Sequence, residues 1–162
     1  MGMTTKGREK GKDMIRHSRP ADFKPLFEIT LTFVEDDSGQ ILLMRRQPWD
    51  SEGGLWDVPG GGIDPGETMI ESALREFKEE SGIRLSEKDV KHFKTVYVQK
   101  PGRDFVMHLY YTSFRGRPEV MLNPEEHGEF KWMAPEEAKK LPLLTDGAET
   151  IDLFLEWKHL SH

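Results

Sequence analysis

Three glutamates, Glu76, Glu79 and Glu80, stand at a spacing that places side chains on one face of an α-helix. Carboxylates crowded on one helix face raise one another's pKa unless a cation lies among them. Hard oxygen ligands in a chain without cysteine favour Mg²⁺ or Mn²⁺ over zinc. The run by itself also fits a solvated helix face, so its meaning depends on its neighbours.

A glycine-rich loop, residues 57–67, leads into this predicted helix. Glycines let a ligand approach the backbone closely. A loop that meets a helix N-terminus is also a natural place for phosphate. A divalent ion held beside a space for phosphate would support attack of water on phosphorus.

Residues 61–83 resemble the Nudix box, G-x5-E-x7-R-E-U-x-E-E-x-G-U, in which U is a bulky apolar residue. The matching positions are Gly61, Glu67, Arg75, Glu76, Phe77, Glu79, Glu80, Gly82 and Ile83. Phe77 stands where the family more often has Ile, Leu or Val, which keeps the apolar role. So many specified positions in one short segment are a far more specific signal than a lone glycine motif. The chain therefore resembles MutT-like Nudix hydrolases over about residues 24–160.

The resemblance implies an α/β fold, an α/β/α sandwich with a mixed β-sheet and helices on both faces. It implies a hydrolase that uses Mg²⁺ or Mn²⁺ to cleave a nucleoside diphosphate linked to another moiety. Glu76, Glu79 and Glu80 would then be metal ligands, with the backbone carbonyl of Gly60 as a further ligand. Two other box residues, Glu67 and Arg75, would pair and hold the loop against the helix.

The family also supplies an acid from a later loop, as metal ligand or general base. In MutT-like members it lies six residues before a tryptophan, and Glu126 lies six residues before Trp132. Glu125 and Glu129 are alternatives, and an ordinary solvated acidic loop is a further one. Glu126 is therefore the expected fourth acidic residue of the site.

Substrate contacts are expected from other elements. Arg45 and Arg46 end a predicted strand, and adjacent strand residues point to opposite sides, so one of them would face the phosphates. Tyr97 is a candidate for stacking on a base. By resemblance to MutT-like enzymes, Asp146 would bind the edge of a purine. For each of these residues a surface or core role is the alternative.

The expected substrate is a small-molecule nucleotide, first a nucleoside triphosphate, including oxidised ones. ADP-ribose or another nucleoside diphosphate derivative, an RNA 5′ end, and a non-catalytic nucleotide sensor are alternatives. A sensor domain typically loses box glutamates, whereas all of them are present here. The related isopentenyl diphosphate isomerases need a cysteine, which this chain lacks.

The elements that must position these residues follow from patterning. Apolar and β-branched runs predict strands over residues 26–35 and 40–46, forming a hairpin, then over 90–100, 105–115 and 130–133. Helical spacing predicts helices over 68–81, 134–141 and 146–158, with Gly82 ending the first. Between 47 and 66 lies a long structured loop that holds a short strand at 56–59.

The whole chain has 162 residues and a formal net charge of −6, which argues against a surface built to bind nucleic acid. Residues 1–19 are basic and are expected to form a flexible arm before a single domain over 20–162. No secretory signal or membrane-spanning run is evident, so a cytoplasmic protein without membrane contact is expected. Nucleic acid is an expected partner only as an RNA 5′ end, and both a monomer and a homodimer remain open.

Overall fold

The computed structural model describes residues 14–161 of the chain. Its strands are β1 (Ile15–Arg16), β2 (Phe27–Glu35), β3 (Ile41–Arg46), β4 (Trp56–Asp57), β5 (Gly60–Gly62), β6 (Lys91–Val98), β7 (Phe105–Ser113) and β8 (His127–Met133). Its helices are α2 (Met69–Ser81), the short 3₁₀ turn η2 (Glu87–Asp89), α3 (Pro135–Ala138) and α4 (Gly147–Ser161). No helix in this part of the chain is long and apolar enough to cross a membrane.

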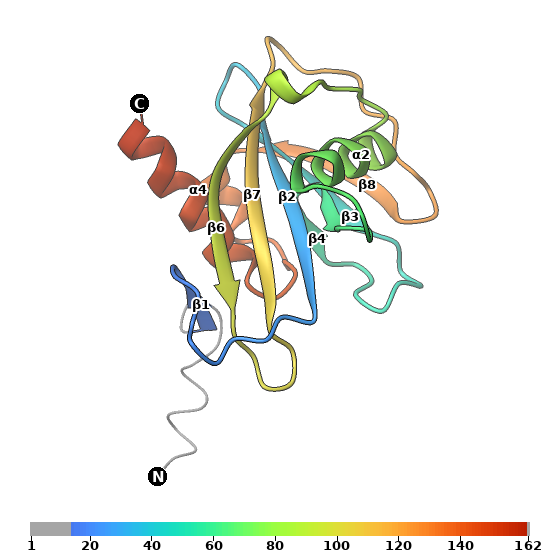
Figure 1. Cartoon of the computed structure of the whole chain (residues 1–162). Coiled ribbons are helices and arrows are strands. Elements are labelled where there is room, and N and C mark those ends of the chain that lie inside the picture. The colour runs from blue at the N-terminus through green and yellow to red at the C-terminus, as the bar shows by residue number, and fades with distance from the viewer. Residues whose placement is uncertain (1–13, 162) are drawn as a thin grey trace.

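The strands pair into a mixed sheet in the order β1-β6-β7-β2-β3-β4 (Figure 1). β5 pairs with β2 and β8 pairs with β3, beside this main path. β2 and β7 run parallel, and the other paired strands run antiparallel. The predicted mixed sheet is therefore confirmed.

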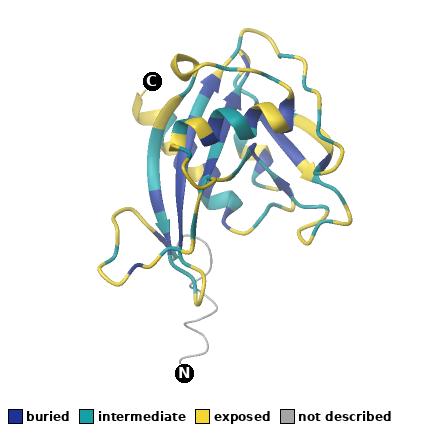
Figure 2. Ribbon diagram, turned by 45° about the vertical axis from the view of Figure 1, so that its right-hand side comes forward, coloured by how far each residue is buried: buried dark blue, intermediate teal, exposed yellow. Residues whose placement is uncertain are grey.

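Helices cover both faces of the sheet. Successive side chains of β3 point to opposite faces, and both sets are buried under a helix. Leu42 and Met44 pack on one face, in a cluster with Phe77 of α2. Leu43 points to the other face, in a cluster with Phe154 of α4. Figure 1 shows α2 and α4 on opposite sides of the sheet, and Figure 2 shows the buried stretches of the strands between them. The expected three-layer arrangement is confirmed.

Local capping fixes the ends of α2. Thr68 caps the N-terminus by accepting a hydrogen bond from the backbone N–H of Glu71, whose side chain in turn accepts from the Thr68 N–H. Gly82 ends the helix with φ of 77°, in the left-handed region that glycine adopts without strain. These two ends set the register of the glutamates on the helix.

The structure differs from the sequence prediction in several places. β2 and β3 pair only at Glu35 and Ile41, while β7 pairs along one edge of β2 and β5 pairs with residues 29–31 on the other edge. β8 begins at His127, three residues earlier than expected. α3 is shorter than expected, and α4 extends to Ser161.

The predicted arm over residues 1–19 needs a correction at its C-terminal end. Ile15 is buried and, with Arg16, forms β1, which pairs with Val98 and Tyr97 of β6. Part of the expected arm is thus an edge strand of the sheet, since an apolar side chain there is covered by the core. The rest of the arm, residues 1–13, lies outside the described residues.

Candidate functional site

The carboxylates of α2 lie directly on the glycine strand β5. Glu80 is only 2 % exposed, and its Oε1 accepts a hydrogen bond from the Gly60 N–H at 2.9 Å. A Cβ atom built on Gly61 would overlap the Glu76 carboxylate, so a side chain there would displace that carboxylate from its observed position. The box helix and the glycine strand are therefore packed with two carboxylates between them.

The electrostatics of this packing disfavour bare carboxylates. Burial raises the pKa of Glu80 well above its usual value, and the nearby charges of Asp57, Glu76 and Glu126 raise it further against the Gly60 hydrogen bond. Burial also raises the pKa of Glu76, which the charge of Arg75 opposes. Such a group of acids is stabilised when a cation shares their charge.

Glu126 reaches the same place from the start of β8. Glu80, Glu126 and His127 each offer a ligand atom, and these atoms all lie within 4.8 Å of one another. Glu125 and Glu129 are not members of this group. We call Glu80, Glu126 and His127 the acidic cluster. The carboxylate oxygens of buried Glu80 and partly buried Glu126 fit a hard divalent cation.

Two contacts fix the backbone that carries Glu126 and His127. The N–H of Gln47 donates to the Glu126 carbonyl at 3.0 Å, and the Gln47 side chain donates to the Pro124 carbonyl at 2.8 Å. A bulge between Arg45 and Arg46 then pairs Arg46 with His127 across β3 and β8. Bulges of this kind re-aim side chains beside active sites.

Glu67 and Arg75 form a bidentate ion pair beside the cluster. Arg75 Nε lies 2.6 Å from Glu67 Oε2, and Nη2 lies 3.0 Å from Glu67 Oε1. Nη1 donates to Glu76 and to Glu79, each at 3.2 Å, and Glu79 is half exposed. Arg75 thus joins the loop before α2 to the helix and neutralises part of its acidic face.

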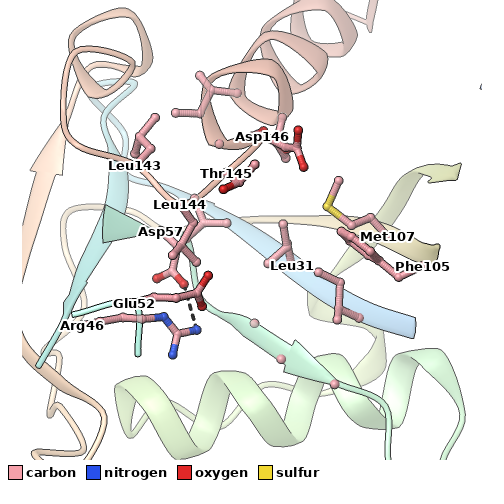
Figure 3. Close-up of a pocket in the computed structure, with 18 of the residues that line it drawn as sticks. Leu31, Arg46, Glu52, Asp57, Phe105, Met107, Leu143, Leu144, Thr145 and Asp146 are labelled. Carbon is pink, nitrogen blue, oxygen red and sulfur yellow. Dashed lines mark hydrogen bonds and ion pairs between the residues drawn. The ribbon is translucent and has the colours of Figure 1, made fainter. Parts of the chain in front are cut away.

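A cavity of about 300 Å³ lies between the sheet and the start of α4 (Figure 3). Its apolar wall comes from β2, β3, β7 and the segment before α4, namely Phe27, Ile29, Leu31, Phe33, Leu43, Phe105, Met107, Leu143 and Leu144. The three glycines of β5 also line it. This volume is at the lower end of the range for small-molecule sites.

Arg46 and Arg45 lie in different surroundings. Arg46 lines the cavity and forms ion pairs with Asp57 at 3.3 Å and Asp50 at 3.4 Å. Arg45 is half exposed, pairs with Glu129 at 3.4 Å and does not line this cavity. Of the two adjacent arginines, the structure therefore places Arg46 at the cavity.

Asp146 and Tyr97 also differ in their position relative to the cavity. Asp146 lines the cavity, is 7 % exposed, and has the only positive φ among the described non-glycine residues, 70°. Lys100 Nζ lies 2.5 Å from its Oδ2, yet no described group donates to either carboxylate oxygen with hydrogen-bond geometry. Tyr97 does not line the cavity; its ring packs edge-on against Phe23, with 5.5 Å between centroids.

Three residues near the site were not singled out by sequence. Asp57 follows the buried Trp56 and precedes the glycines, His127 is adjacent to Glu126, and Lys100 precedes a Pro-Gly turn. Adjacency to Glu126 was the available signal for His127. Nothing in the local pattern distinguishes Asp57 or Lys100 from other charged residues, because their positions at the site come from packing.

Comparisons with known proteins agree with this geometry. A family model described as NUDIX domain matches residues 27–157. A CTP pyrophosphohydrolase of Escherichia coli K12 is 30 % identical over 133 residues, covering 80 % of this chain and 92 % of that protein. A putative 8-oxo-dGTP diphosphatase of Bacillus subtilis is 36 % identical over 110 residues, covering 68 % of this chain and 66 % of that protein.

Among solved structures, the solution structure of the E. coli ORF135 protein superposes with a TM-score of 0.68 at 26 % identity. The match covers 87 % of this chain and 96 % of that chain. The family match over residues 27–157 includes β2 to β8, the helix that carries the glutamates and the segment before α4.

Proposed function

Because this chain belongs to the Nudix family and is a hydrolase of phosphorus-containing anhydrides, we propose that it is a pyrophosphohydrolase of nucleoside triphosphates. One observation carries the proposal. Gly60 of β5 donates to Glu80 and is also part of the cavity wall. A nucleotide in the cavity would therefore have its phosphates next to the carboxylates of α2.

In this proposal the box glutamates Glu76, Glu79 and Glu80 hold the divalent ions, Mg²⁺ or Mn²⁺, together with Glu126 and the carbonyl of Gly60. The ions held by these residues would supply polarisation of the phosphoryl oxygens and would ease loss of a proton from the attacking water. Glu126 acts as a ligand or as the base that accepts the proton of that water.

Arg46 would contact the phosphates from the cavity wall. It lines the cavity and is held there by Asp57 and Asp50. Its guanidinium is suited to two phosphate oxygens at once. Arg75, in contrast, is fully engaged with carboxylates and the Gly62 carbonyl, so it supports the site without reaching substrate.

The base would lie against the apolar wall with its polar edge at Asp146. In Figure 3, Thr145 and Asp146 lie away from the group of Arg46, Glu52 and Asp57. An ionised carboxylate can only accept hydrogen bonds, so Asp146 favours a base with an exocyclic amino group, which donates them. The names of two relatives, a CTP pyrophosphohydrolase and a putative 8-oxo-dGTP diphosphatase, refer to bases of this kind.

The test is product release from a nucleotide panel in the presence of Mg²⁺. The panel contains CTP, UTP, GTP, 8-oxo-dGTP, ADP-ribose and an RNA with a 5′ triphosphate. We expect turnover of triphosphates with amino-bearing bases and loss of nearly all turnover in Glu80→Gln. Higher turnover of ADP-ribose or RNA would contradict the proposed substrate class. A folded wild-type protein without turnover of any substrate would contradict the proposed enzymatic activity.

A further inference from the structure

His127 is a buried imidazole with no hydrogen-bond partner. It is 1 % exposed, and within residues 14–161 neither Nδ1 nor Nε2 makes a hydrogen bond. Buried polar groups almost always have a partner, since leaving one unpaired lowers the free energy of unfolding. A ligand that is absent from a bare protein chain would supply such a partner.

The position of His127 indicates what that ligand is. One of its ring nitrogens lies within 4.8 Å of carboxylate oxygens of both Glu80 and Glu126. Two atoms bound to one divalent ion at about 2.1 Å lie at most about 4.2 Å apart. Ligand atoms at right angles on the ion lie only about 3.0 Å apart, so side-chain movements of up to about an ångström would close the acidic cluster around an ion.

The neighbouring aspartate completes the arrangement. Nε2 of His127 lies 3.6 Å from Asp57 Oδ1, which is buried and also without a hydrogen-bond partner. Histidines that bind a metal usually direct their second ring nitrogen to a carboxylate or carbonyl oxygen. At 3.6 Å the two groups are too far apart for a hydrogen bond in the absence of a ligand. An ion bound through Nδ1 would leave Nε2 free to donate to Asp57 in that role.

The surrounding backbone is rigid enough for a metal site. The Glu126 and His127 N–H groups both donate to the Asn123 carbonyl at 3.0 Å, and Gln47 holds the same turn from the other side. A side chain on Gly128 would collide with the Gln47 amide. Preorganised ligands of this kind need little reordering when an ion binds.

We propose that His127 is a nitrogen ligand of the metal centre, beside Glu80 and Glu126. The proposal rests on the proposed metal-dependent function but goes beyond the box glutamates, which supply oxygen only. Imidazole strengthens binding of first-row transition ions more than that of Mg²⁺. The site is therefore selective for Mn²⁺ over Mg²⁺ to a degree that carboxylates alone would not give.

Electron paramagnetic resonance of bound Mn²⁺ tests this without any nucleotide. Wild-type protein with one equivalent of Mn²⁺ is expected to show spin-echo modulation from a directly bound imidazole nitrogen, which changes when the histidines are isotope-labelled. His127→Gln should lose this modulation. His108→Gln is the matched control, because His108 is also buried but bonds Glu28 and Thr95 elsewhere in the sheet.

Competition by Mg²⁺ gives a second measurement. We expect the Mn²⁺-to-Mg²⁺ affinity ratio to fall at least about tenfold in His127→Gln and to stay unchanged in His108→Gln. Bound Mn²⁺ without nitrogen modulation in the wild type would overturn the role of His127, whatever the variant does. The nucleotide panel reports separately on the proposed activity, so a failure of one is distinguishable from a failure of the other.

Discussion

Gly61 lies so close to Glu76 that a methyl group at its Cα would overlap the carboxylate. We expect Gly61→Ala to displace Glu76 from the metal site and to lower Mg²⁺-dependent kcat about a hundredfold, because misplaced ligands of this kind cost about that much. Steady-state kinetics on the best nucleotide of the panel measures the effect.

Gly62→Ala is the matched control for this prediction. A Cβ atom at Gly62 meets no neighbour within 4 Å, and its backbone does not have positive φ. Activity within about twofold of wild type is expected, since the added methyl group points into open space. An equal loss of activity in both variants would show that the glycine strand tolerates no side chain at either position. The effect of Gly61→Ala could then not be assigned to displacement of Glu76.

The buried position of Glu80 predicts a pH-dependent stability of the metal-free protein. A group whose pKa is raised on folding stabilises the fold below its unfolded pKa of 4.5, and this contribution is lost as the pH rises through the folded value. Metal-free wild type should therefore lose stability relative to Glu80→Gln between acidic and neutral pH. Thermal unfolding in the presence of a chelator measures this difference.

Metal ions should make the wild type more stable than Glu80→Gln, which reverses the order of stability expected without metal. At a hundredfold excess over its Kd, an ion adds about 2.7 kcal/mol to the folded state, or about 5–10 °C in Tm for a chain of this size. We expect this increase in wild type at neutral pH and a much smaller one in Glu80→Gln. The same increase in both proteins would remove Glu80 from the set of ligands.

Asp146→Asn probes base selection without disturbing the backbone. Asparagine tolerates the positive φ of this position, and the substitution replaces an acceptor-only group by one that also donates. We expect the CTP-to-UTP ratio of kcat/KM to fall about 10- to 100-fold, as for loss of a charged hydrogen bond. Asp152→Asn, the same change at an exposed residue outside the cavity, should leave the ratio unchanged.

The turn after β2 provides a prediction on acid stability. Burial would raise the pKa of Asp36, but hydrogen bonds from Arg117, Gln40 and Ser38 outweigh it and lower the pKa from 3.8 to about 2. The stabilisation is present above pH 3.8 and is lost as the pH falls through about 2. We expect it to amount to about 1–2 kcal/mol, because Arg117 is half exposed and screened by solvent.

Urea unfolding of wild type and Asp36→Asn measures this contribution. The difference in free energy of unfolding between wild type and Asp36→Asn should be largest near neutral pH and should decrease between pH 3.8 and about 2. If this difference stayed constant over the range, the loss of stability in Asp36→Asn would come from packing and not from charge.

The box could be predicted from sequence because its residues are contiguous and act through one helix. The spacing of Glu76 and Glu80 and the stop at Gly82 depend only on local geometry, and the structure has the helix within one residue of its predicted bounds. The mixed sheet with helices on both faces was likewise predictable once the box was recognised, since that order of elements accompanies it.

Other features depend on partners that periodicity does not specify. The pattern of β2 shows which side chains are buried but not which strands pair with its edges, so the long parallel pairing with β7 was missed. The unpartnered ring of His127 and the partly buried pair of Arg46 and Asp57 exist only because β3, β4 and β8 meet. Ile15 was assigned to an arm because two paired residues leave almost no pattern.

The parallel ladder of β2 with β7 has a consequence for the order of folding. It joins residues 27–35 to residues 105–113, so the entire box lies inside the chain segment that this pairing closes. Long-range pairing of this kind is slow to form. During synthesis the edge of β2 stays open until β7 has left the ribosome, and β8, which carries Glu126 into place, emerges later still. Glu126 therefore joins the proposed metal site only after the box glutamates and β7 have been synthesised.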